Sequence, residues 1–155
     1  MYTILCFAAI FMQYGYSLPT PPAPENPPVP AFLEDAPQPV INSFHRLIRN
    51  AHNLTDRQID KAVEEWVEQQ SDDIQSKWIA FQPERERQES EAARRHQAAY
   101  AKFSDEAQLV DAKLRDIASH SELTAREKFM MIRHILEKLP KSVKHEIENA
   151  LFSQV

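Results

Sequence analysis

The chain has 155 residues, a formal net charge of −5, one cysteine and one glycine. The negative charge argues against nucleic acid or an anionic membrane as the main partner, because both attract basic proteins. A lone cysteine (Cys6) cannot form an intramolecular disulfide or a cysteine-based zinc site. With Gly15 as the only glycine, the usual phosphate-binding loops and nucleophile elbows are excluded. We therefore predict that the protein is not an enzyme.

The first 17 residues contain no charged side chain and include an apolar run from Ile4 to Met12. This run is too short to span a bilayer, and small residues follow it at Gly15 and Ser17. The pattern is typical of a secretory signal peptide, although the usual basic residues before the run are missing. No later apolar run is long enough to cross a membrane. We predict a signal peptide over residues 1–17 and a secreted, extracellular protein.

The next segment is rich in proline, with nine prolines between Leu18 and Pro39. Such a composition cannot bury a core and favours an extended, polyproline-like chain. We predict a leader over residues 18–38, from which Phe32 and Leu33 can fold back onto the rest of the protein. A helical domain over residues 39–155 follows.

Apolar residues recur at helical spacing throughout residues 39–155, and no strand-like alternation appears. The sequence therefore predicts an all-α fold, a compact bundle of five or six helices. Helix starts are expected at a proline and at hydroxyl residues that can cap a helix: Pro39, Thr55, Ser71, Ser104, Thr124 and Ser142.

Two turns in the domain share one pattern. Leu54-Thr55 is followed by Gln58, and Leu123-Thr124 is followed by Glu127. In such a capping box, the hydroxyl group and the side chain three residues later accept hydrogen bonds from the backbone at a helix start. We interpret the two turns as the centres of two helix-loop-helix units.

Two further residue types predict where helices end. Asn50 and Asn53 are expected to adopt the left-handed backbone conformation that closes a helix, because glycine is absent there. Pro83 interrupts the third helix, either as a kink or as a boundary.

The stretch from Asp116 to Glu127 fits the twelve-residue calcium loop of an EF-hand in degenerate form. Ala118, His120 and Ser121 replace residues that such a loop normally requires. Oxygen ligands of this kind would suit a weakly held Mg²⁺ or Ca²⁺. The expected ligands are Asp116, the Glu122 carbonyl, Thr124 and Glu127. A capping box alone also explains Thr124 and Glu127, so both interpretations stay open.

A second candidate site is the N-glycosylation sequon Asn53-Leu54-Thr55, in which Asn53 would carry the sugar. A helix cap at Thr55 explains the same residues without a sugar.

Aromatic residues and two methionines recur at helical spacing, which is what a filled core requires. The alternative is a cavity that carries a fatty acid or another small apolar ligand. The residues concerned are Trp66, Trp78, Phe81, Phe103, Phe129, Met130 and Met131.

Several strings, taken together and in order, resemble the SXP/RAL family of nematode secreted antigens and allergens. They are Pro30–Pro37, Ile59–Trp66, Ala101–Ser104, Leu123-Thr124 and Leu139–Val143. The resemblance implies a compact, loosely calmodulin-like helical fold, secretion, and host proteins or antibodies as partners. It also implies a cation-binding domain, with Mg²⁺ the usual suggestion. Departures from the family pattern are Asp35, where glycine is common, and Pro83. The expected function is that of a secreted, non-enzymatic, antigen-like binding protein.

Overall fold

The computed structural model describes residues 29–152, and side chains up to residue 147. The expected signal peptide and most of the proline-rich leader lie outside these residues. All regular structure in the described part is helical, which confirms the all-α class. The elements are η1 (Ala31–Leu33), α2 (Gln38–Asn50), η2 (Ala51–Asn53), α3 (Asp56–Glu68), α4 (Asp72–Tyr100), α5 (Asp105–Ser119), α6 (Ala125–Glu137) and α7 (Lys141–Phe152).

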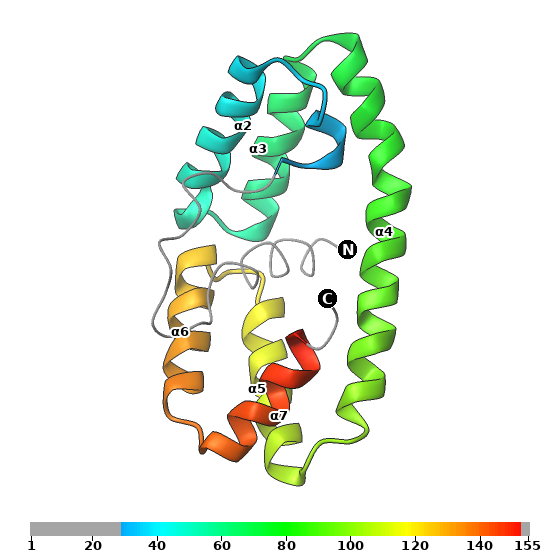
Figure 1. Cartoon of the computed structure of the whole chain (residues 1–155). Helices are drawn as coiled ribbons and strands as arrows, with labels where there is room; N and C mark the ends of the chain where they lie inside the picture. The colour runs from blue at the N-terminus through cyan, green and yellow to red at the C-terminus, as the bar shows by residue number, and fades with distance from the viewer. Residues whose placement is uncertain (1–28, 153–155) are drawn as a thin grey trace.

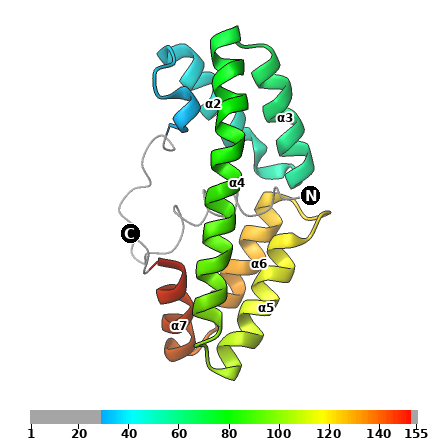
Figure 2. The same cartoon turned by 90° about the vertical axis from the view of Figure 1, so that its right-hand side faces the viewer.

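The longest helix, α4, runs the length of the molecule along one side (Figure 1). Its 29 residues correspond to about 44 Å at the usual helical rise. At one end it contacts η1 and α3, and at the other it contacts α5 and α7. The view turned by 90° shows α4 in front of both groups (Figure 2). The arrangement is that of two helix-loop-helix units bound to one long helix.

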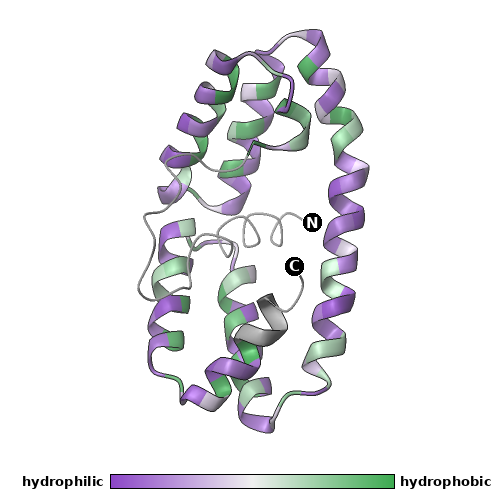
Figure 3. Ribbon diagram, in the orientation of Figure 1, coloured by the Kyte–Doolittle hydropathy of each residue, from purple (hydrophilic) through white to green (hydrophobic). Residues whose placement is uncertain are grey.

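No helix within residues 29–152 is both long enough and apolar enough to cross a membrane. The colouring by hydropathy shows that α4 is largely hydrophilic along its middle (Figure 3). Apolar residues instead gather on the helix faces that meet at each end of the molecule.

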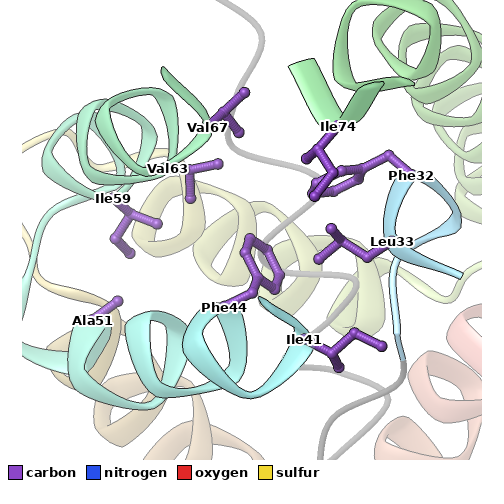
Figure 4. Packing of buried hydrophobic residues seen from close by; sticks show 9 residues of the cluster. All are labelled: Phe32, Leu33, Ile41, Phe44, Ala51, Ile59, Val63, Val67 and Ile74. Carbon is purple, nitrogen blue, oxygen red and sulfur yellow. The ribbon is translucent and has the colours of Figure 1, made fainter. Parts of the chain in front are cut away.

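The first core cluster lies between η1, α2, α3 and the start of α4 (Figure 4). Phe32 and Leu33 from η1 are buried in it, so the end of the leader folds back onto the domain as expected. The ring centroid of Phe32 lies 5.6 Å from that of Phe44, 4.9 Å from Trp78 and 5.5 Å from Phe81. These are ordinary distances for aromatic packing. The buried members are Phe32, Leu33, Ile41, Phe44, Ala51, Ile59, Val63, Val67 and Ile74.

The second core cluster joins α5, α6 and α7. Ser104 caps the start of α5, as expected. The Ser104 hydroxyl oxygen accepts a hydrogen bond from the Ala107 N–H at 3.3 Å. Glu146 of α7 accepts hydrogen bonds from the Ser104 N–H at 2.9 Å and from its hydroxyl at 3.1 Å. The buried members are Ala107, Leu114, Ile117, Ile132, Leu136, Val143 and Ile147.

Two local expectations are wrong, and a third is wrong in one of its two alternatives. Pro83 is not a helix boundary, because α4 continues through it. Arg87 lies about one turn later; its Nη2 is 2.7 Å from Glu84 Oε1 and its Nη1 is 3.2 Å from Glu91 Oε1. These ion pairs support the helix beyond the hydrogen bond that a proline cannot donate. Asn50 is right-handed, with φ −84° and ψ −11°, because the chain continues into the 3-10 turn η2. The last helix, α7, begins at Lys141, which places Ser142 inside it.

His45 is the one buried histidine among the described residues, with 3% of its surface exposed. Neither ring nitrogen has a hydrogen-bond partner in that part of the chain. Burial, and then the positive charge of Arg49, lower the pKa of His45 below its ordinary value of 6.5. The folded protein therefore holds this ring neutral at a pH where the unfolded chain protonates it.

Acid is expected to weaken the fold through this residue. Because the unfolded chain binds the proton more readily, the free energy of unfolding falls as the pH drops below about 6.5. The slope is at most about 1.4 kcal/mol per pH unit. We expect His45→Leu to reduce the pH dependence of the free energy of unfolding, measured by urea unfolding between about pH 7.5 and pH 5. His134→Gln changes an exposed histidine and is expected to keep the pH dependence of the wild type. Equal slopes for the wild type and His45→Leu would contradict the prediction.

Candidate functional site

The two capping-box turns lie against each other, although they are far apart in the sequence. Thr55 and Thr124 form an isolated antiparallel β-bridge. The Ala125 N–H donates a hydrogen bond to the Leu54 carbonyl at 3.0 Å, and Ala125 also packs against the first core cluster. The loops thus join the two ends of the molecule on the side away from α4 (Figure 1). We call them the paired loops, residues 51–55 and 120–124.

Both capping boxes are confirmed. In the second loop, Glu127 Oε2 accepts hydrogen bonds from the Thr124 N–H at 2.8 Å and from its hydroxyl at 2.7 Å. In the first loop, Gln58 Oε1 accepts from the Thr55 N–H at 2.9 Å. The two hydrogen bonds from Thr124 lower the pKa of Glu127 below its ordinary value, since they stabilise the charged carboxylate.

Of the remaining predicted ligands, Asp116 lies in the last turn of α5 and Glu122 lies in the second loop. Asp116 and Glu122 are both exposed. The Glu122 carboxylate accepts a hydrogen bond from the Ser121 hydroxyl at 3.1 Å, and the Glu122 main-chain N–H donates to His120 Nδ1 at 3.3 Å. Across the described residues, no group of three or more His, Cys, Asp or Glu is arranged to hold a metal ion. Metal binding at this site stays a prediction. Its expected ligands are Asp116, the Glu122 carbonyl, the Thr124 hydroxyl and Glu127.

Next to the paired loops lies a buried ammonium group that the sequence does not predict. Lys128 is 7% exposed. Its Nζ donates to Asp56 Oδ2 at 2.6 Å and to the Ala118 carbonyl at 2.8 Å. It thereby connects α6 with the start of α3 and the end of α5. The helical period gives the signal that could have found it, because Lys128 precedes the buried Ile132 by one turn and Leu136 by two.

A second buried charge lies between α4 and α5. The Asp111 carboxylate is buried. Its two oxygens lie 2.8 Å from His96 Nε2 and 2.9 Å from Arg115 Nε. The Arg115 guanidinium also lies over the Tyr100 ring, 5.0 Å from its centroid. These contacts tie the lower half of α4 to α5 and account for His96 without a metal.

The residues proposed to line a cavity instead pack in several different places. Trp66 lies 5.1 Å from Phe44, and Trp78 and Phe81 both pack on Phe32. Phe103 packs against the second core cluster. Met130 and Met131 are 51% and 44% exposed, so the expectation that they fill the core is wrong. The reason is that the buried face of α6 passes through Lys128, Ile132 and Leu136, which turns both methionines outward.

Asn53, the predicted glycosylation residue, ends η2 at an exposed position. An exposed asparagine in a turn is what the modification requires. Occupancy of the sequon stays a prediction.

Comparison with known proteins finds relatives over almost the whole chain. The family described as "SXP/RAL-2 family protein Ani s 5-like, metal-binding domain" matches residues 1–154. The SXP/RAL-2 family protein Ani s 5 of Anisakis simplex is 36% identical over 147 residues, 95% of this chain and 94% of that protein. The OV-17 antigen of Onchocerca volvulus is 36% identical over 126 residues, 81% of this chain and 77% of that antigen. No solved structure matches significantly. The family match and these relatives confirm the resemblance read from the sequence: the chain belongs to the SXP/RAL-2 family.

Proposed function

We propose that the protein is a secreted, non-enzymatic binding protein of antigen type, and that residues 116–127 hold a divalent cation weakly. The observation that carries the cation proposal is the Glu127 carboxylate, which hydrogen bonds keep charged at the last position of the loop. The metal-binding description of the matching family supports it. By analogy with the antigen relatives, host proteins or antibodies would be the macromolecular partners.

The donors of the loop account for a weak site. Glu127 Oε2 and the Thr124 hydroxyl are already bonded to each other. This leaves Glu127 Oε1, Asp116 and the Glu122 carbonyl for the ion. Ca²⁺ takes six to eight oxygen ligands, whereas Mg²⁺ keeps several waters and binds through one or two carboxylates. The donor set therefore fits a largely hydrated Mg²⁺ better than Ca²⁺.

Calorimetric titration of the protein with Mg²⁺ and with Ca²⁺ tests this proposal. We expect a dissociation constant on the order of 10⁻³ M, the range of weak extracellular sites. Glu127→Gln is expected to abolish the heat, because it removes one of the two carboxylates that would bind the ion directly. The fold should survive this change, since Gln58 makes the same capping contact in the first loop. No heat from the wild type at about ten times that concentration, or equal heat from the variant, would refute the site.

A further inference from the structure

The ammonium group of Lys128 stands where the two helix-loop-helix units meet. Its two hydrogen-bond acceptors come from different units: the Asp56 carboxylate in the first turn of α3, and the main-chain carbonyl of Ala118 at the end of α5. Both side chains of the ion pair are largely removed from solvent, with 9% of the lysine and 15% of the aspartate side chain exposed. The contact is therefore a buried ion pair between units rather than a surface salt bridge.

The acceptors resemble the ligands of a hard cation. Ala118 is the third residue of the frame that runs from Asp116 to Glu127, a position that supplies a side-chain oxygen ligand in a functional calcium loop. Alanine has no such oxygen, and its carbonyl accepts from the ammonium group instead. Asp56 adds the negative charge, which the N-terminus of α3 also favours. A carboxylate and a carbonyl oxygen thus surround a positive charge that belongs to the chain itself.

We propose that the Lys128 ammonium group takes the place of a bound metal ion between the two helix-loop-helix units, beside the paired loops. This group fixes the two units against each other without a metal. The ammonium group also donates a hydrogen bond to the Ala118 carbonyl of the stretch that would bind Mg²⁺ or Ca²⁺, and like charges disfavour each other at short range. Lys128 therefore limits the affinity of that loop for divalent ions. This second role rests on the proposed function, whereas the first does not.

The first role is tested without metal by a double-mutant cycle on the full chain in EDTA. Lys128→Met keeps most of the aliphatic stem and removes the charge, and Asp56→Asn removes the charge of its partner. Each single change leaves the other group buried and unpaired, while the double change removes both charges. We expect each single variant to melt several degrees lower. The double variant should lose clearly less than the sum of the two losses.

Lys61→Met is the matched control, because Lys61 forms a surface pair with Glu65 at 3.6 Å and both side chains are exposed. It should leave the melting temperature nearly unchanged. Additive losses for Lys128→Met and Asp56→Asn would overturn the proposal. If a single variant does not fold, a folded double variant supports the coupling, and an unfolded double variant contradicts it.

The second role is tested by titrating Mg²⁺ and Ca²⁺ into Lys128→Met or, if that variant does not fold, into the double variant. We expect several-fold tighter binding than in the wild type. Equal affinity would overturn the inhibitory role while leaving the weak site in place. No binding by any variant would overturn both the proposed site and the inhibitory role. The double-mutant cycle in EDTA would still decide whether Lys128 ties the loops together.

Discussion

Replacing Leu136 with alanine is expected to lower the free energy of unfolding by about 2–5 kcal/mol. Leu136 is 6% exposed and lies in the second core cluster, where α6 meets α5 and α7. Truncation removes apolar contacts and leaves a cavity that the surrounding helices can only partly close. Urea unfolding followed by far-ultraviolet circular dichroism measures the loss.

Leu109→Ala provides the control for this change, because Leu109 is 74% exposed on α5. Its effect should stay within about 0.5 kcal/mol. EDTA provides a second comparison, since a ligand at ten times its dissociation constant adds only about 1.4 kcal/mol. We therefore expect chelation to cost less than Leu136→Ala. If chelation alone unfolds the protein, the stability comes from a cation and not from burial.

Replacing Phe32 with alanine is expected to cost about 3–5 kcal/mol, although the residue belongs to the stretch that precedes the first long helix. Its ring is in contact with Phe44, Trp78 and Phe81, so it joins η1 to both α2 and α4. The loss of one ring thus removes the centre of an aromatic cluster. Differential scanning calorimetry should show a clearly lower melting temperature.

Val29→Ala tests whether the loss of stability requires a buried side chain or follows from any substitution in the leader. Val29 lies three residues earlier and is exposed. We expect a change within about 0.5 kcal/mol. If Phe32→Ala were equally mild, η1 would not be part of the core. The end of the leader would then act as a spacer.

The sequence predicts the parts of the fold that depend on neighbouring residues. The capping boxes at Thr55 and Thr124 are local patterns, and both are found where the sequence places them. The Ser104 cap is local in the same way, but its second partner, Glu146, comes from a helix much later in the chain. Only the first contact could be expected from spacing.

The sequence does not predict the contacts between the two units. Nothing in either Leu-Thr turn indicates that Thr55 and Thr124 form a bridge. The buried face of α6 was misplaced for a related reason. A rule that puts apolar residues inside excludes Lys128 and favours Met130 and Met131, yet a largely covered aspartate on another helix makes the lysine acceptable there. The sequence likewise does not decide between a cation site and a helix cap, because a degenerate calcium loop and a capping box use the same residues.

The paired loops change how the molecule can deform. In a dumbbell joined by a single helix, bending that helix is enough to swing one end relative to the other. Here the ends are joined twice, by α4 on one side and by the contacts of Leu54, Thr55 and Asp56 with the second loop and α6 on the other. The chain therefore forms a closed frame with α4 as its strut (Figure 1). Bending α4 would strain the contacts between the paired loops on the opposite side. Surfaces that combine residues from both ends therefore keep their shape.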